Sequence, residues 1–522
     1  MQLIMMLVEL RDIVKNTIST SFLTLCVLLL ALTFIRKSAK RKMDLPGPWG
    51  LPIFGSALWM GERPHLTLTK MAKKYGPIYQ IRLGTKPFVV LTGLRLIKQA
   101  LGKQAVEFAG RPAFDSFRSV FNGNSVSFST YSERWKKMKK IQHSGVKMNL
   151  SGTRLNDLEG VILDQAKNIV KQVTAEIKDS HGYIFNPNDG IRFALGNVTY
   201  FILFNRTFAY EDKDLKRLVL LSDLFSKATQ AANPADVMPW TKIVPSINKR
   251  QTDFLKLWND IGDWIADMIA KLKSGDGRQG SVIDFTDYVM KIRDEITQEE
   301  LTSLKMDRST IMTTIDEFFA ASFETVASCI LWCVLYMMEY PDVQSRVQKE
   351  LDQVVGPDRT PCLDDKPNLP YTQACIHEMM RCMSVVPLAI PHATTCDTEL
   401  NGHFIPKDTA VLINIYGTNH DETVFQNPHD FDPDRFLTED GAALDKAKIE
   451  DHISFSLGRR RCIGEPLAHM KVYLLFVTMM YHCTFRKVSD DQVLDFRGNF
   501  GLAVQPDHFD VLVNRRATKA ED

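Results

Sequence analysis

One cysteine near the C-terminal end of the chain, Cys462, has the surroundings of a reactive thiolate. It lies in the run FSLGRRRCIG, which covers residues 455–464, and Pro466 follows at a place typical of the first turn of a helix. The positive end of that helix and three neighbouring arginines would both lower the pKa of the thiol. We therefore expect Cys462 to be a thiolate, the form that binds metals.

The residues around Cys462 favour a flat, metal-containing ligand. Gly458 permits a tight turn that brings the loop under the sulfur, and Gly464 leaves room where a Cβ would block a flat group. Arg460 is suited to bind a propionate carboxylate through two parallel hydrogen bonds. Haem satisfies these features, with Cys462 as the axial ligand of its iron. The alternative is a buried cysteine beside a basic surface loop.

The spacing F-x-x-G-x-R-x-C-x-G resembles the haem-binding signature of the cytochrome P-450 monooxygenases. Five fixed identities in ten positions rarely match by chance. The resemblance implies that haem b is bound by Cys462 and surrounded by Phe455, Gly458, Arg460 and Gly464. It also implies the fold of that family, which is mainly α with small β-sheets.

A long apolar segment from Ile311 to Tyr340 predicts a buried central helix. Its middle holds Glu324 and Thr325, polar groups that cost free energy inside a protein unless they are solvated or used. In the resembled family a small-Gly-x-acid-Thr pattern here hosts dioxygen and relays protons, which implies catalytic roles for both residues. Ser322 replaces the glycine, so loosening of the helix would rely on its hydroxyl. The alternative is a surface acid beside a threonine bonded to its own helix.

Three further residues resemble the Glu-Arg-Arg lock of the same family. Glu378 and Arg381 are three residues apart on one face of a predicted helix, a pattern that alone is usually a weak surface ion pair. Arg435 follows in the run FDPDRF, ahead of the cysteine loop. The resemblance implies a structural lock that holds the segment presenting Cys462.

Three residues are expected near the haem edge. Trp135 and Lys139 occupy the place where the family has a Trp-x-x-x-Arg pair that donates to a haem propionate. Lys139 keeps the positive charge of the arginine but lacks the guanidinium that can form two parallel hydrogen bonds. His392 lies in a proline-bounded segment, residues 386–394, that predicts a strand, at a position that often contacts a propionate. A solvated loop histidine is the alternative for His392.

Lys136 and Lys137, next to Trp135, would suit docking of an acidic electron donor. A plain solvated basic face is the alternative. The resemblance implies NADPH-cytochrome reductase, a flavoprotein, as the donor, and cytochrome b5 as a further partner.

Family position also implies a set of residues around the substrate, each of which could instead be simple core. Their aromatic content favours a flat, hydrophobic substrate such as a polycyclic aromatic or a steroid. The expected residues are Phe114, Phe117, Phe121, Phe225, Asp316, Phe319, Ala320, Leu388, Ile390 and Leu502.

The composition of the 522-residue chain is that of a globular protein with a large core, at 45% hydrophobic and 24% charged residues. We find no linker or repeat after the N-terminal region. A net charge of +2 argues against nucleic acid as a partner. Nine scattered cysteines show no disulfide framework, which favours a reducing compartment, and we expect Cys329 and Cys333 to be core residues.

The N-terminal region predicts a membrane anchor. Residues 16–35 carry no charge and are long enough to span a bilayer, and five basic residues follow between Arg36 and Lys42. A cleaved signal peptide is the alternative, but no small-residue cleavage site follows. We therefore expect a lumenal tail (residues 1–15), an anchor (16–35), a basic and proline-rich hinge (36–52) and a cytoplasmic haem-binding domain (53–522) on the endoplasmic reticulum membrane.

Other patterns predict the elements of that domain. Residues 78–83 and 88–92 predict a hairpin around the sequence GTKP, and the rest is mainly helical, with amphipathic runs at residues 253–272 and 342–355. Pro341 is well placed to begin the second run.

The resemblance implies a monooxygenase that inserts one oxygen atom from O2 into a hydrophobic substrate, using NADPH electrons delivered by a reductase. A fatty acid hydroxylase or a hydroperoxide isomerase on the same fold is an alternative, although such isomerases tend to lack the acid-Thr pair that Glu324 and Thr325 match. A haem-binding sensor or carrier without activity is another.

Overall fold

The computed structural model describes residues 43–175, 177, 182–229, 233–273 and 283–516. The predicted tail and anchor, residues 1–35, and the first part of the hinge, residues 36–42, lie outside the described residues. Residues 43–52 of the hinge contain no helix, as their prolines predict.

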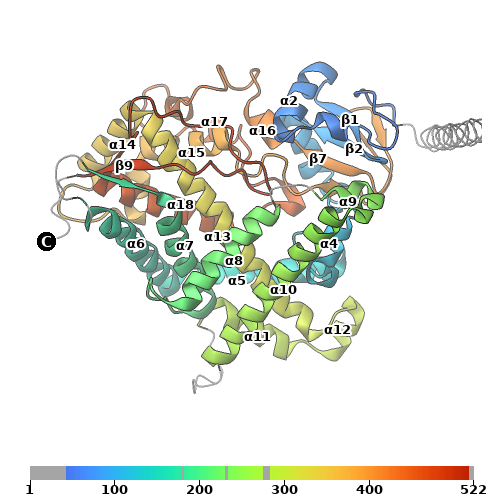
Figure 1. Cartoon of the computed structure of the whole chain (residues 1–522), viewed down its shortest axis with the longest axis horizontal. Helices are drawn as coiled ribbons and strands as arrows, with labels where there is room; N and C mark the ends of the chain where they lie inside the picture. The colour runs from blue at the N-terminus through green and yellow to red at the C-terminus, as the bar shows by residue number, and fades with distance from the viewer. Residues whose placement is uncertain (1–42, 176, 178–181, 230–232, 274–282, 517–522) are drawn as a thin grey trace, which may run out of the picture.

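A small β-rich region lies at one end of a helical body (Figure 1). Its main sheet has the strand order β1-β2-β7-β4, in which β1 (Ile78–Leu83) and β2 (Lys86–Leu91) form the predicted hairpin. The second strand begins at Lys86, two residues earlier than expected, because only Gly84 and Thr85 form the turn. Strand β7 (Ala410–Ile413) then pairs in parallel with β2.

The segment expected to form a strand past the haem edge is mostly irregular. Only β4 (His392–Ala393) pairs, with β7. Ala389 has a left-handed backbone with φ of 52°, and Pro387 and Pro391 have no N–H to donate, so a longer strand cannot form.

Two smaller sheets complete the β-structure. One contains β3 (Tyr183–Phe185), β9 (Val511–Arg515) and β8 (Cys483–Arg486), and the other contains β5 (Thr398–Leu400) and β6 (His403–Ile405). The fold is therefore mainly helical with small sheets, as predicted.

Helix α13 (Arg308–Glu339) is the predicted central helix. The Asp307 side chain accepts from the Thr310 amide at 2.8 Å and so caps its first turn, and Pro341 follows its end. In the described part of the chain it alone is long and apolar enough to cross a membrane, but its most apolar stretch is 78% buried. It is a core helix.

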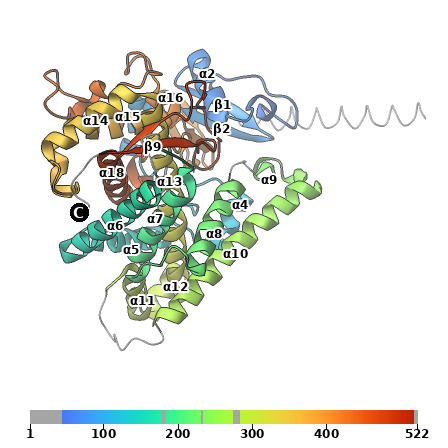
Figure 2. The same ribbon diagram turned by 60° about the vertical axis from the view of Figure 1, so that its left-hand side comes forward.

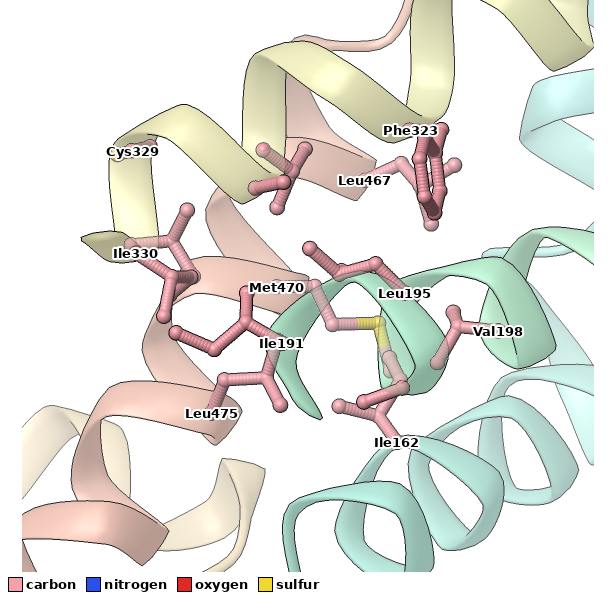
Figure 3. Close-up of a cluster of buried hydrophobic side chains, with 14 of the residues drawn as sticks. Ile162, Ile191, Leu195, Val198, Phe323, Cys329, Ile330, Leu467, Met470 and Leu475 are labelled. Atoms are coloured by element: carbon pink, nitrogen blue, oxygen red, sulfur yellow. The ribbon is translucent and has the colours of Figure 1, made fainter. Parts of the chain in front are cut away.

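Helix α13 and three other long helices form the core around the site. Figure 3 shows side chains from α6 (Gly152–Ala175), α7 (Pro187–Phe204), α13 and α18 (Glu465–His482) meeting in one apolar cluster. Met470 of α18 lies among Ile162, Leu195 and Val198 there. This packing fixes α18, which follows Cys462, against α13.

The other helices surround this core. Two of them match the amphipathic runs: α10 (Pro245–Lys273) and α14 (Pro341–Val354). Figure 2 shows α10 beside α8. The remaining helices are α2 (Pro64–Tyr75), α3 (Leu94–Ile97), α4 (Asp115–Ser119), α5 (Glu133–Met148), α8 (Lys213–Thr229), α9 (Pro234–Val237), α11 (Phe285–Glu295), α12 (Gln298–Leu304), α15 (Pro370–Met383), α16 (Ile415–Asn419) and α17 (Lys446–Ile449).

Candidate functional site

The cysteine loop has the turn that its glycines predict. Gly458 has φ of 67°, in the left-handed region, and an added Cβ would overlap the carbonyl oxygen of Leu101. The Cys462 amide donates to the Phe455 carbonyl at 2.9 Å, which closes the loop. Helix α18 begins at Glu465, so the sulfur lies just before its first turn.

The Cys462 thiol borders an internal cavity of about 330 Å³. Its sulfur is exposed towards this cavity, while protein surrounds it on its other sides. An added Cβ on Gly464 would lie 3.9 Å from the sulfur, so the glycine leaves the space beside it open. This is the space in which a ligand of the thiol would lie.

The pKa of the Cys462 thiol differs from our expectation. Burial raises it, and this outweighs the backbone amides of Gly464 and Glu465, which lower it. The arginines contribute less than expected because Arg461 forms an ion pair with Glu465, at 2.6 and 2.8 Å. A metal ion bound to the sulfur would supply the missing positive charge, since coordination deprotonates a thiol.

Helix α13 lines another part of the cavity with Ala321, Ser322, Thr325 and Cys329. The Thr325 hydroxyl donates to the Ala321 carbonyl at 2.9 Å, the bond to its own helix that the alternative interpretation predicted. Its oxygen can still accept a hydrogen bond. The Thr325 hydroxyl therefore lies at the cavity, and its role in a proton relay stays a prediction.

Glu324 does not line this cavity, in contrast to the prediction that it assists Thr325. Its carboxylate is buried against α7, where Arg192 donates to it at 2.9 Å, and Gln505 also donates to it. Adjacent residues on a helix point about 100° apart, so Glu324 and Thr325 face different neighbours. The acid joins α13 to α7 and the hydroxyl faces the cavity.

Ser322, which stands in place of the family's glycine, also contacts other helices. Its hydroxyl lies 3.3 Å from the hydroxyl of Thr199 on α7, and its carbonyl accepts from the Lys471 ammonium at 3.2 Å. Helix α13 continues through this position without a break. The serine hydroxyl therefore contacts α7, and the contact with Lys471 is made by the backbone.

A basic cluster lines the cavity: Arg111, Lys139, His392 and Arg460. The Arg460 guanidinium donates to the carbonyls of Ala109, Val126 and Ser129, at 2.7–3.0 Å, and lies over the Trp135 ring. The Trp135 indole N–H donates to the Val126 carbonyl at 2.8 Å instead of pointing to a ligand. The Lys139 ammonium donates to the Arg459 carbonyl, and His392 Nδ1 lies 2.7 Å from the Phe108 carbonyl.

Arg111 belongs to the same cluster but was not among the predicted residues. Its guanidinium donates to the carbonyls of Ser127, Ile390 and Pro391, at 2.7–3.1 Å. No carboxylate in the described part of the chain pairs with any cation of this cluster. Burial and mutual repulsion lower the pKa of Lys139 to about 8, and burial lowers that of Arg460 to about 9.

These residues fit haem. A thiol is a ligand for haem iron, and clustered cations bound mainly to neutral carbonyls provide the positive potential that two propionate carboxylates require. Carboxylates bound at this cluster would restore the pKa values that burial lowers. The donor set and the cavity therefore agree with the ligand expected from the sequence.

Another polar residue of the cavity wall, Glu317, was also not predicted. Its buried carboxylate accepts from the Ser125 hydroxyl, the Val126 and Ser127 amides at 2.7 and 3.0 Å, and Gln142 at 3.1 Å. It ties α13 to the loop before α5. Burial raises the pKa of Glu317.

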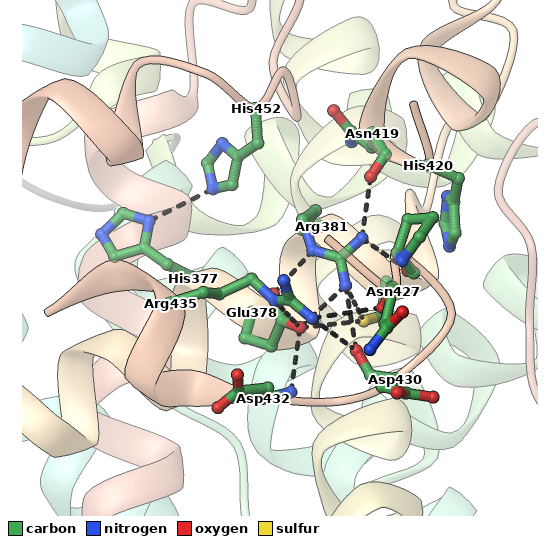
Figure 4. A network of polar contacts seen from close by, with 12 residues as sticks. His377, Glu378, Arg381, Asn419, His420, Asn427, Asp430, Asp432, Arg435 and His452 are labelled. Carbon is green, nitrogen blue, oxygen red and sulfur yellow. Dashed lines mark hydrogen bonds and ion pairs between the residues drawn. The ribbon is translucent and has the colours of Figure 1, made fainter. Parts of the chain in front are cut away.

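The structure brings together the three residues of the expected lock (Figure 4). Arg381 donates to both oxygens of Glu378, at 2.6 and 2.7 Å, and Arg435 donates to one of them at 2.9 Å. The two arginines also donate to the carbonyls of residues 426–430 and Asn419. Helix α15 is thereby joined to the segment that leads towards the cysteine loop.

Most of the expected substrate residues lie outside this cavity. Ile390 lines it, and Phe225 lies in α8, where its side chain is outside the described part. Aromatic packing occupies several of the others: Phe114 contacts Phe117, Phe121 contacts Trp258, and Phe319 contacts Trp264. The residues that do not line this cavity are Phe114, Phe117, Phe121, Asp316, Phe319, Ala320, Leu388 and Leu502.

The apolar part of the cavity wall comes instead from neighbouring positions on the same elements. Val126 precedes α5, Phe318 and Val326 belong to α13, and Val385 and Val386 follow α15. This is the cavity that contains the Cys462 thiol, so the residues expected around the substrate stay a prediction.

Comparisons with known proteins agree with this site. A family model described as Cytochrome P450 matches residues 45–513. The chain is similar to Cytochrome P450 1A1 of Pleuronectes platessa, at 35% identity over 511 residues that cover 96% of this chain and 97% of that protein. It is also similar to Cytochrome P450 1B1 of Homo sapiens, at 35% identity over 514 residues that cover 96% and 94%.

Proposed function

The chain belongs to the cytochrome P450 family, and from that premise we propose that it is a membrane-anchored enzyme that oxidises a hydrophobic, planar aromatic or steroid-like substrate. Membership makes it a haem monooxygenase that uses haem b, O2 and electrons from NADPH delivered by a reductase. The observation that carries the proposal is the Cys462 thiol in a cavity that also contains Thr325 and a basic cluster.

When bound, haem supplies the chemistry of dioxygen reduction and oxygen transfer. Cys462 would hold its iron, and Arg111, Lys139, His392 and Arg460 would hold its propionates. Thr325 Oγ1 would accept a hydrogen bond from the cavity and, by turning its hydroxyl away from the Ala321 carbonyl, would donate its own proton there. Glu324 would act indirectly by fixing α13 against α7.

The substrate class is supported by the cavity wall and by the relatives. Beside its polar and charged groups, the wall contains apolar side chains such as Val126, Phe318, Val326, Val385 and Val386, which favours a hydrophobic substrate. The relatives named Cytochrome P450 1A1 and 1B1 match across nearly the whole chain.

Binding spectra test the substrate class. Polycyclic aromatics and steroids should shift the Soret band of the ferric protein in a saturable way, and long-chain fatty acids should not. Conversion of a spectrally active compound, with one oxygen atom from labelled O2 in the product, should then require NADPH and reductase. Saturable shifts with fatty acids alone would contradict the planar substrate.

The anchor, the hinge and the location on the endoplasmic reticulum remain part of the proposal, as does cytochrome b5 as a partner. Lys136 and Lys137 on α5 are the proposed docking residues for the reductase. Lys136 lies 2.6 Å from Glu133, and Lys137 lies 2.7 Å from Glu300 of α12, so both charges are partly balanced within the protein. A Lys136→Glu, Lys137→Glu variant should slow reductase-supported turnover, and an unchanged rate would exclude docking there.

A further inference from the structure

Lys471 is a buried lysine to which the function above assigns no role. It lies on α18 between Met470 and Val472, and its exposed fraction is 0%. The neighbouring turns of α18 and the facing part of α13 are apolar, as Leu467, Leu475 and Phe323 show in Figure 3. A buried cation usually has an acidic partner, so its place in an apolar contact between two helices needs an explanation.

The Lys471 ammonium has one protein acceptor. It donates to the Ser322 carbonyl on α13 at 3.2 Å, and no other acceptor for it is found among the residues that the structure describes. Lys471 nevertheless borders the same cavity as Ser322 and Thr325. An ammonium carries three N–H groups, so two of them remain to donate to a water molecule that a small movement of the fully buried side chain would admit from the cavity.

The position of the acceptor connects Lys471 to Thr325. Ser322 and Thr325 are three residues apart on α13 and so lie on the same face of the helix. The Thr325 hydroxyl donates a hydrogen bond to the Ala321 carbonyl, and its oxygen can accept a hydrogen bond from the cavity. A water molecule that accepts from Lys471 and donates to Thr325 would connect the two groups.

The other titratable groups of this wall are committed elsewhere. Glu324 is paired with Arg192, and Glu317 accepts four hydrogen bonds from the loop before α5 and from α5. Arg111, Lys139, Arg460 and His392 form the basic cluster, Arg461 is paired with Glu465, and Cys462 is the expected ligand of the iron. Lys471 is the group beside Ser322 that can still release a proton.

The electrostatic surroundings of Lys471 are neutral. Burial is the sole cause that lowers its pKa, to about 7. On the elements that pack on α18, Glu317, Glu324, Glu350, Glu378, Arg381, Glu159 and Arg486 have partners or are exposed. Asp316 of α13 is a further titratable group there, and burial and the neighbouring Glu317 raise its pKa to about 7. The ammonium and the neutral amine are therefore both accessible near neutral pH.

We propose that Lys471 holds a proton at Nζ against the Ser322 carbonyl and passes it, through one water molecule, to Oγ1 of Thr325. The proton leaves the ammonium, which becomes a neutral amine, and the Thr325 hydroxyl turns from the Ala321 carbonyl and releases its own proton to the dioxygen being reduced in the cavity as it takes up the incoming one. Water in the cavity returns a proton to the amine before the next cycle. This role rests on the proposed function. Because Lys471 acts through Thr325, it is a positioning residue and not a catalytic one.

The first test measures the titration of Lys471 directly. The holoenzyme is labelled with ¹⁵N-lysine and studied by NMR in the diamagnetic ferrous carbon monoxide state, and the signal missing from a Lys471→Arg variant is assigned to Nζ. A midpoint near pH 7 supports the proposal. A midpoint near the ordinary pKa of lysine, about 10.4, would overturn it, whether or not any variant folds.

The second test separates proton release from charge and packing. Lys471→Arg keeps a donor and a charge but does not release a proton near neutral pH, and Lys471→Met keeps most of the volume. In the wild type, product formed per NADPH should fall as pH rises through 7. In both variants this break should disappear and the yield should fall roughly 100-fold, within the range for lost proton transfer.

Two outcomes would contradict the role. If Lys471→Arg keeps the wild-type yield, the lysine is only a hydrogen-bond donor, and if the pH break persists in Lys471→Met, another group supplies the proton. The carbon monoxide difference spectrum of each variant should match the wild type. Failure of this role is thereby distinguished from failure of the thiolate assignment itself.

Discussion

Thr325 and Glu324 are adjacent in the chain but face different surfaces of α13. The hydroxyl faces the cavity, and the carboxylate joins α13 to Arg192 of α7. At the scale of single residues, the proposed proton relay therefore depends on which side chains face the cavity, and not on which residues are adjacent in the sequence.

Replacing Thr325 with alanine should remove the proton acceptor of the cavity wall. We expect product formation to fall roughly 100-fold, while NADPH consumption falls much less. Thr325→Ser keeps the hydroxyl and should retain most of the yield. Product and NADPH measured together check this, and a Thr325→Ala variant with normal yield would contradict the relay.

The Glu324–Arg192 pair should contribute to stability. Glu324→Gln removes the carboxylate that balances a buried guanidinium, so we expect the free energy of unfolding to fall by about 3–5 kcal/mol. Replacing both residues with methionine should recover much of that loss. Urea unfolding of the wild type and of these variants measures both changes. A stable Glu324→Gln protein with no turnover would show instead that the acid takes part in the chemistry.

The sequence could identify a residue of the site where interactions between neighbours in the chain determine its position. The turn at Gly458 depends on local spacing and was predicted. Lys471 and Arg111 were not, because burial of a charge is decided by distant segments. Each nevertheless left a signal, since Lys471 interrupts an apolar helix and Arg111 is the one basic residue of the run EFAGRP at residues 107–112.

At the scale of elements, the lock joins α15 to the segment before the cysteine loop. Glu378 and Arg381 are fully buried, and Glu378 balances two guanidinium groups. Carbonyl oxygens of the intervening segment accept the remaining N–H groups. The position of the cysteine loop relative to α15 therefore depends on one carboxylate.

Glu378→Gln should release this segment. Two buried cations would lose their counter-charge, so we expect several kcal/mol of lost stability and little retained haem. The exposed pair of Arg346 with Asp434, at 2.7 Å, is a control on the same segment, and Arg346→Met should cost less than about 1 kcal/mol. The haem content and the unfolding midpoint of each variant distinguish Glu378→Gln from Arg346→Met. Equal effects would show that the lock has no special role.

Helix α13 and the β1–β2 hairpin were predicted from the sequence to within three residues at each end, because hydrophobic periodicity and turn residues act locally. The strand expected at residues 386–394 was largely wrong, since Ala389 turns the chain between two prolines. The thiol pKa was also wrong in direction, because depth in the protein is a property of tertiary packing.

At the scale of the whole molecule, buried histidines should make the protein sensitive to acid. Burial lowers the pKa of His65 to about 4 and those of His377, His420 and His452 to about 3. The unfolded chain takes up protons near pH 6.5, but the folded chain does so only near pH 3–4. Stability should therefore fall as pH falls below 6.5, by about 1.4 kcal/mol per pH unit for each histidine.

Urea unfolding at pH 7.5, 6.5 and 5.5 measures this slope. His452→Gln should reduce it by the share of one histidine, and His143→Gln, at an exposed position, should leave it unchanged. A slope that is flat between pH 6.5 and 5.5 would show that these histidines are protonated in the folded protein.

The central claim, that Cys462 binds haem iron as a thiolate, is tested most directly by the carbon monoxide difference spectrum of the dithionite-reduced protein beside a Cys462→Ser variant. We predict a strongly red-shifted Soret band in the wild type that is absent from the variant. A band typical of histidine ligation, or one that the substitution leaves unchanged, would contradict the account.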